Sequence, residues 1–429
     1  MRGALASAAL VCTAWLGPFA ARAEDAAAGG GEAAGADEAE PDERSRYDWY
    51  IVPNIAYDSD DGLGFGVRGE LAVPEEGYDP YRVAYVVHAF ASLRNFHHHR
   101  FRFDRVGLGR NRNIRLTLHL AYRQWGNDGY WGIGNGTTRE REFAGDYDTD
   151  DPRRKRYRYN LIQPFGHLTL RAEQGHGLAV FCSLNAKYTW VRTHGNPDTG
   201  FLTLLDEQQP YGMDGGLTIL VSAGLIYDSR RPEVDPQRGV LAEVSGQWAL
   251  PLPWGPGSFG GLFLSLRAFY AVTPWLVLAG RIMGEMLAGQ VPFYEMVHWR
   301  GSVPISGFGG FETLRGISFG RWRAPSKAVM NLELRFRLGQ HSLARRPAVW
   351  QLALFGDTGV VWGAGDQATA PEPDFPLHVT GGLGIRLVYA ESFVGRVDAG
   401  FGLDPVREPD GAITQELSYG VYVVFDHAF

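Results

Sequence analysis

Three charged side chains in the C-terminal part of the chain have the types and spacing of one ion-pair cluster. Arg315 lies in the Gly-rich stretch 301–323, whereas Asp357 and Glu333 lie on the polar faces of two successive predicted strands. Two carboxylates in a confined space repel each other, and a guanidinium can bond both in a fixed planar geometry. The pattern predicts a latch in which Arg315 binds Asp357 with Glu333 close by, while Gly316 lets the backbone turn tightly. The alternative is that each charge separately faces water.

Two other motifs suggest chemistry but lack its structural context. Residues 316–320 read Gly-Ile-Ser-Phe-Gly, which matches the nucleophile elbow of hydrolases, but that elbow needs a strand before it and a helix after it. A hydrolase with Ser318 as nucleophile is therefore the least favoured alternative. His97, His98 and His99 are consecutive, and consecutive strand residues point to opposite faces, so they do not predict a metal site. We predict no cofactor and no enzymatic activity.

The elements that must position these residues are strands with one apolar and one polar face. Over residues 327–338 the even positions are apolar and most odd positions are polar, which is the alternation of a strand with two unlike faces. Many of the predicted strands are longer than the roughly 9–11 residues that a tilted strand needs to cross a bilayer. The pattern predicts sixteen strands, near 47–59, 62–74, 80–94, 97–108, 112–125, 155–171, 177–193, 214–228, 238–250, 257–272, 275–289, 326–339, 348–362, 376–389, 393–404 and 413–428.

The lengths of the connections agree with a membrane barrel. The long connections 126–154, 194–213 and 290–325 all follow odd-numbered strands, and most connections after even-numbered strands are short. Long loops outside and short turns inside are typical of outer-membrane barrels, as is an even strand count. We therefore predict an all-β, 16-stranded antiparallel transmembrane β-barrel whose long extracellular loop 290–325 is folded into the lumen. A passive or gated pore for small solutes is the functional alternative from a different class.

Composition supports the same class. The chain has 56 Gly and 13% aromatic residues, and no segment after residue 23 approaches the ~20 apolar residues of a membrane helix. Residues 1–23 are predicted to be a secretory signal peptide with an Ala-Arg-Ala cleavage site, which leaves 39 basic and 48 acidic residues and a net charge of −9. Nothing in this balance suggests a nucleic-acid partner. With Cys12 removed, Cys182 is the only cysteine, so no intramolecular disulfide is expected.

Both ends of the mature chain carry further signals. Residues 24–46 are acidic and rich in Ala and Gly, which predicts a disordered linker before a barrel that spans 47–429. At the C-terminus, Phe425 and the final Phe429 are expected on the lipid face of the last strand. An aromatic terminal residue in that position resembles the sorting signal of outer-membrane barrels.

Four motifs together resemble the bacterial surface antigen family, the barrel shared by BamA-like assembly factors and two-partner secretion translocators. Leu314-Arg315-Gly316-Ile317 resembles the family's loop motif, although Ile317 stands where the family has Phe or Tyr. The other three motifs are Phe355-Gly356-Asp357-Thr358-Gly359, Asn331-Leu332-Glu333, and the turn that begins with Asp228-Ser229-Arg230 and ends with Pro236-Gln237-Arg238-Gly239.

The resemblance implies a location in the bacterial outer membrane and a role in the insertion or translocation of proteins or lipids. It implies contact with outer-membrane lipid, including lipopolysaccharide, and with unfolded outer-membrane protein clients. Members of the BamA type carry periplasmic POTRA domains, but the segment between Ala23 and Tyr47 has room only for a linker. A member without these domains would need a separate periplasmic partner. If the family mechanism is retained, a weakened seam between the first and the last strand opens laterally.

Overall fold

The computed structural model describes the chain from Tyr47 onward, with short gaps. The described residues are 47–58, 61–76, 78, 81–143, 155–232, 235–303, 307–343, 346–371, 373, 376–389, 393–425 and 429. The predicted signal peptide and the predicted linker 24–46 lie outside this part of the chain.

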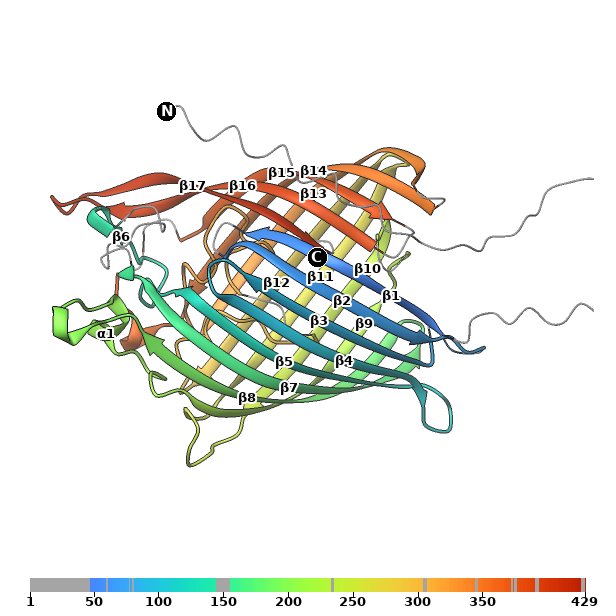
Figure 1. Cartoon of the computed structure of the whole chain (residues 1–429), viewed down its shortest axis with the longest axis horizontal. Helices are drawn as coiled ribbons and strands as arrows, with labels where there is room; N and C mark the ends of the chain where they lie inside the picture. Colours follow the sequence, from blue (N-terminus) through green and yellow to red (C-terminus); the bar gives the residue numbers. More distant parts are fainter. Residues whose placement is uncertain are drawn as a thin grey trace, which may run out of the picture. The chain divides into compact units, whose positions relative to one another are not determined.

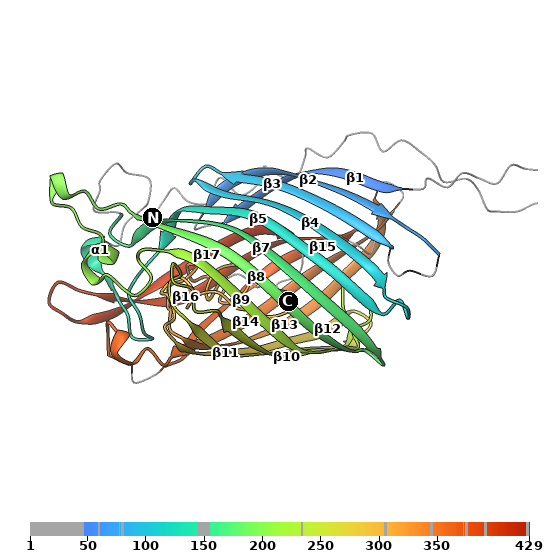
Figure 2. The same ribbon diagram turned by 90° about the horizontal axis from the view of Figure 1, so that it is seen from below.

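Sixteen long antiparallel strands form a closed barrel, and a seventeenth strand of two residues, β6, joins its rim. Each long strand pairs with the next one along the chain, and β1 also pairs with β17. Figures 1 and 2 show the tilted strands side by side around the wall. The strands are β1 Asp48–Asp58, β2 Gly62–Val73, β3 Val83–Ser92, β4 Phe96–Leu108, β5 Ile114–Gly129, β6 Arg139–Glu140, β7 Arg158–Gly175, β8 Leu178–Thr193, β9 Gly216–Asp228, β10 Arg238–Ala249, β11 Phe259–Thr273, β12 Leu276–Gly289, β13 Ser326–Leu343, β14 Arg346–Trp362, β15 His378–Tyr389, β16 Phe393–Arg407 and β17 Ile413–Phe425. The predicted strand count and antiparallel order are thus confirmed.

The alternation that predicted the strands also defines the two faces of the wall. On β13, Leu332 and Leu334 are 48% and 39% exposed, whereas Asn331 and Glu333 are each 1% exposed. The same contrast holds along β14, where Leu354 is exposed and Asp357 is buried. Because the sheet is closed, the exposed apolar side chains form the outer face and the polar face is turned to the lumen.

Helical structure is confined to the connections. The only α-helix of the described residues is α1, Leu204–Gln208, and the 3-10 turns are Arg141–Phe143, Pro197–Thr199 and Gly365–Gln367. None of the helices in this part of the chain is long and apolar enough to span a membrane.

The position predicted for the terminal aromatic side chain is wrong. Strand β17 ends at Phe425, and Phe429 is 6% exposed and packs against Phe269, a buried residue of β11. The Phe429 ring also lies 5.0 Å from the Arg281 guanidinium, which belongs to the polar face of β12. Phe429 therefore lies against the polar face rather than the lipid face. The side chain of Phe425 lies outside the described side chains.

Candidate functional site: a buried ion-pair cluster between loop and wall

The loop between β12 and β13 delivers Arg315 to the polar face of the wall. Its guanidinium Nε and Nη2 donate to Asp357 Oδ2 and Oδ1 at 2.9 and 2.8 Å, and its backbone N–H donates to Oδ2 at 3.1 Å. Nη1 of Arg315 donates to Glu333 Oε1 at 2.5 Å. All three side chains are fully buried. The residues predicted to form the latch are therefore in contact.

A third carboxylate completes the cluster and was not predicted. Asp398 on β16 accepts from Arg315 Nη1 at 3.2 Å and also binds Arg396 on its own strand. On β15, Arg386 donates to Glu333 Oε1 at 2.7 Å. The only signal in the sequence was Arg396 and Asp398 at i and i+2 on a polar strand face, which is too common a pattern to single out.

Three residues of the 355–359 motif, Phe355, Asp357 and Gly359, each make a separate contact with the loop. The Arg315 guanidinium lies 3.5 Å from the centroid of the Phe355 ring, and Asp357 binds the same guanidinium. A Cβ atom at Gly359 would lie 2.8 Å from the ring of Phe308 in the loop, so only Gly leaves room for the loop at this position. On one face of β14, Phe355 thus stacks on the guanidinium of the loop, Asp357 binds it, and Gly359 leaves room for the loop.

Gly316 connects the loop to the last two strands. Its N–H donates to the Tyr422 hydroxyl at 3.0 Å, and its carbonyl accepts from Ser418 Oγ at 2.7 Å, both on β17. Gly316 has a φ of +102°, and a Cβ atom there would lie 2.5 Å from the backbone N of Phe401 on β16. A residue with a side chain would be strained in φ and would collide with β16.

The rest of the loop buries apolar and charged side chains against the same face. Phe293, Trp299 and Trp322 are fully buried in one cluster with wall residues that include Phe263 and Val329. Such large aromatic side chains contribute much of the burial energy of an interface. The loop is therefore held along most of its described length, and not by the ion pairs alone.

Glu295 forms a second charged contact between loop and wall. Its Oε1 lies 2.5 Å from Lys187 Nζ on β8, and its Oε2 binds Arg300 of the loop. Burial acts to raise the pKa of Glu295, but attraction to the two cations outweighs it and lowers the pKa to about 2. Glu295 is thus ionised at neutral pH, as a buried carboxylate with two cationic partners should be.

The turn between β9 and β10 is explained by its own geometry. Asp228 Oδ1 and Oδ2 accept from Arg230 Nε and Nη2 at 3.0 and 2.8 Å. Gly239 has a φ of +106°, and a Cβ atom there would lie 2.3 Å from the Ser229 carbonyl oxygen. Asp235 of the same turn accepts from Arg337 Nη1 on β13 at 2.8 Å. These contacts build a tight turn between β9 and β10.

The seam between the first and last strands is short. All 11 residues of β1 pair with β2, but only Tyr57 and Asp58 pair with β17, opposite Val423 and Tyr422. Between β16 and β17, by contrast, the ladder runs from Gly395 to Arg407. Among the described strands, β17 and β1 therefore share the shortest ladder of the barrel wall.

Residues 139–141, between β5 and β7, contact the hairpin of β16 and β17. The two-residue strand β6 pairs in parallel with Val406 and Arg407 of β16. Next to it, Arg141 Nη2 lies 2.7 Å from Glu408 Oε1, and Arg139 Nε lies 2.7 Å from Asp404 Oδ2. We call the ion pairs of Arg139 and Arg141 with this hairpin the rim clamp. It was not predicted, because two residues give no periodic pattern.

The serine and histidine motifs are not assembled into a reactive site. The described residues on both sides of Ser318 form turns without a following helix, which is not the setting of a nucleophile elbow. His97 and His99 are neighbours with ring centroids 6.0 Å apart, whereas His98 lies 6.3 Å from His88 on the polar face. In the part of the chain that the structure describes, no three His, Cys, Asp or Glu side chains are grouped to hold a metal ion.

The fold and the buried cluster define a β-barrel closed on itself with a loop anchored to its polar face. The Omp85 superfamily domain matches residues 108–421, so the chain belongs to that superfamily. Family and fold together indicate an outer-membrane protein. In the residues described, the barrel is not accompanied by any POTRA-like domain. A comparison with curated protein sequences finds no match to this chain.

Solved structures of two kinds of outer-membrane barrel are similar in fold. BamA from Haemophilus ducreyi lacking POTRA domains 1–3 matches with a TM-score of 0.54 at 13% identity, over 90% of this chain and 70% of that one. CdiB from Escherichia coli matches with a TM-score of 0.52 at 12% identity, over 87% and 62%, and CdiB from Acinetobacter baumannii with 0.50 at 11% identity, over 88% and 60%. The chain thus spans less than two thirds of either CdiB chain. At these identities the matches establish the fold, and function must be argued from the site.

Proposed function

We propose that this barrel assists the insertion or translocation of polypeptides at the bacterial outer membrane. The short ladder between β1 and β17 is the observation that supports this proposal most strongly. Among the described residues, every other pair of neighbouring long strands shares at least nine residue pairs, so the least costly place to open the wall is the seam, where two described pairs join the strands. An opening there would give an unfolded client lateral access to the bilayer.

In the proposal, the loop folds into the lumen and the latch keeps it there. Arg315 links three strands through Asp357, Glu333 and Asp398, and Gly316 adds β17. Breaking a buried charged pair by removing one partner costs about 3–5 kcal/mol. A loop held in this way would seal the lumen while leaving the seam as the route of opening.

The family resemblance suggests the clients, the lipid and the periplasmic partner of this barrel. Clients are unfolded outer-membrane proteins, the surrounding lipid includes lipopolysaccharide, and a separate periplasmic protein supplies what POTRA domains supply elsewhere. Affinity purification of the full chain from native membranes tests the last point. Recovery of a stoichiometric periplasmic protein is expected, and repeated recovery of the barrel alone would remove this partner from the proposal.

A disulfide across the seam tests the proposed opening. Tyr57→Cys with Val423→Cys, in a Cys182→Ser background, joins two residues that face each other across β1 and β17. Proteoliposomes with the oxidised variant should fail to accelerate insertion of an unfolded outer-membrane barrel protein, and reduction should restore the rate.

The matched control is a disulfide across a complete ladder. Ile55→Cys with Phe65→Cys joins β1 to β2, which are fully paired. It should leave the insertion rate unchanged. Equal insertion by the oxidised seam variant and this control would show that the seam does not open.

A pore for small solutes is the second candidate. The proposal predicts small conductance in planar bilayers for the intact protein, and larger conductance after Arg315→Ala releases the loop. Large, steady conductance that Arg315→Ala does not change would favour the pore instead.

A further inference from the structure

We propose that the polar face of β2–β5 binds an anionic ligand that carries phosphate. This wall differs from the rest of the barrel in charge. Alternation along the four strands places five arginines on the polar face against three carboxylates. The arginines are Arg68, Arg100, Arg102, Arg115 and Arg123, and the carboxylates are Glu70, Asp104 and Asp128.

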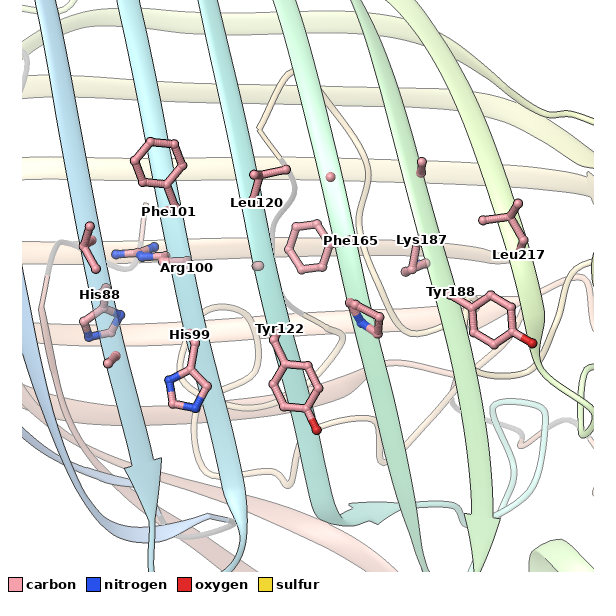
Figure 3. Close-up of a pocket in the computed structure, with 16 residues that line it drawn as sticks. His88, His99, Arg100, Phe101, Leu120, Tyr122, Phe165, Lys187, Tyr188 and Leu217 are labelled. Carbon is pink, nitrogen blue, oxygen red and sulfur yellow. The ribbon is translucent and has the colours of Figure 1, made fainter.

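Strand register groups the cations closely. Arg68 on β2 is opposite His88 on β3, and His88 is opposite Arg100 on β4, so the two arginines are two strands apart. Neighbouring strands are about 4.8 Å apart, which puts these two backbone positions roughly 10 Å from each other. Arg102 follows Arg100 on the same face and is opposite His119 on β5. Figure 3 shows His88 and Arg100 on adjacent strands of this wall.

Two of the three carboxylates of this wall have an arginine partner, and Asp128 Oδ2 accepts from the Tyr159 hydroxyl at 2.6 Å. Arg68 Nη2 donates to Glu70 Oε2 at 3.1 Å. Asp104 is fully buried and accepts from Arg115 Nε at 3.0 Å, from Tyr81 and from Thr117. The arginines still outnumber the acids, so the wall carries excess positive charge.

The opposite wall shows the contrast. On β13–β16 the arginines of the polar face lie among carboxylates that are fully buried: Arg335 and Arg386 bind Glu333, and Arg396 binds Asp398. That arrangement is a closed ion-pair network. In a network of this kind the arginines already have carboxylate partners.

The basic wall reaches solvent. The side chains of Arg68 and Arg115 are 32% and 33% exposed, and Arg100 is half-buried. Their neighbours on the outer side of the same strands are apolar, for example Phe101 and Leu120, which Figure 3 shows beside Arg100. The solvent that the arginines meet is therefore that of the lumen.

Phosphate is the anion that suits this wall. A guanidinium offers a planar fork that matches phosphate oxygens, and two arginines about 10 Å apart can bind one phosphorylated head group from both sides. Two sources can supply the phosphate: the head group of a lipid that enters at the seam between β1 and β17, or a soluble phosphate in the lumen. Strand β1 lies between that seam and β2. The inference does not depend on the proposed role in protein insertion.

Binding of a short-chain phosphatidic acid to the purified full chain in detergent tests the proposal. Dihexanoyl phosphatidic acid should bind, and dihexanoyl glycerol, which lacks the phosphate, should not. Arg100→Gln with Arg102→Gln should weaken binding about tenfold or more, because a hydrogen bond to a charged group contributes about that factor. The control is Arg105→Gln, which removes one positive charge from the outer face of the same strand.

The results of these binding measurements distinguish a lipid head group from a soluble phosphate, and they also show whether the proposal fails. Competition by inorganic phosphate at similar concentration identifies a soluble anion as the ligand, whereas lack of competition identifies a lipid head group. Equal binding by wild type and the double variant overturns the proposal, provided that the double variant keeps the heat-dependent gel mobility of a folded barrel. Equal weakening by Arg105→Gln also overturns it, since binding would then follow net charge alone.

Discussion

At the scale of single residues, Arg315 is the centre of the site because it meets three carboxylates that would otherwise be buried together. Asp357, Glu333 and Asp398 come from three strands, and each is fully buried. Buried like charges are costly without a cation between them. The cluster therefore stabilises both the loop and the wall, and neither is independent of the other.

Removing the guanidinium should destabilise the barrel. Arg315→Ala leaves Asp357 and Glu333 without their shared partner, with an expected loss of about 3–5 kcal/mol in the free energy of unfolding. Denaturant unfolding in detergent measures this change in the free energy of unfolding. Arg110→Ala, at an exposed arginine of a turn, is the control and should change stability by less than about 0.5 kcal/mol. Indistinguishable unfolding curves for the two variants would contradict the role of Arg315.

A methyl group at position 316 should release the loop without changing any charge. Gly316→Ala adds a Cβ atom 2.5 Å from the Phe401 backbone at a φ of +102°. Gly411→Ala is the control, because Gly411 also has positive φ, +87°, but nothing within 4 Å. Limited proteolysis should cut the loop of Gly316→Ala faster than that of Gly411→Ala. Equal rates of loop cleavage in the two variants would show that the close contact of Gly316 with β16 does not hold the loop in place.

For single residues, the sequence predicted the contacts of Arg315 with Asp357 and Glu333, but it did not predict the residues that lie around them. Strand parity could assign Asp357 and Glu333 to the polar face, and Arg315 could be added as the loop cation that offsets their charge. Asp398 could not be added, since nothing local distinguishes it from other polar residues on β16. Phe429 was misplaced because parity holds only within a ladder, and β17 ends at Phe425.

At the scale of elements, alternation alone located every long strand. Pro164 and Gly166 lie in the middle of β7, which nevertheless runs without a break from Arg158 to Gly175. Its ladder with β8 omits Gln163 and Pro164 but resumes in the same register. A missing N–H removes a hydrogen bond without forcing a bulge. The rim clamp was missed because it depends on contacts between loops, which no local pattern encodes.

The rim clamp should resist acid. Hydrogen bonds from Arg141 and Thr414 lower the pKa of Glu408 to about 2, compared with about 4.3 for a free Glu. A lowered pKa means that the stabilisation is present above about pH 4.3 and is lost only as pH falls toward 2. Spin labels at positions 142 and 410 should report an unchanged distance at pH 3.

The control for this measurement removes one partner of the clamp. Arg141→Gln keeps the length and polarity of the side chain but cannot pair with Glu408. Its distance distribution should already be broad at pH 7. A wild-type distribution that broadens by pH 4 would show that Glu408 does not hold the clamp.

At the scale of the whole molecule, loops are bound to the barrel wall in two places, and one ladder of the wall is short. The loop between β12 and β13 is bound to the polar face, and the rim clamp ties β6 to the hairpin of β16 and β17. Among the described residues, two residue pairs join β1 to β17. The closed fold followed from sequence patterns, whereas the length of each ladder depends on how strand ends are staggered around the barrel, which alternation does not determine.

Hydrogen–deuterium exchange of the full chain in lipid bilayers tests this account most directly. The account predicts that amides of β1 and β17 exchange faster than those of the other long strands, with β13 and β14 among the slowest because the latch binds them. It also predicts that oxidation of the Tyr57→Cys, Val423→Cys pair slows exchange in β1 and β17. Protection of β1 and β17 equal to that of β13 and β14 in the unmodified protein would contradict a weak seam.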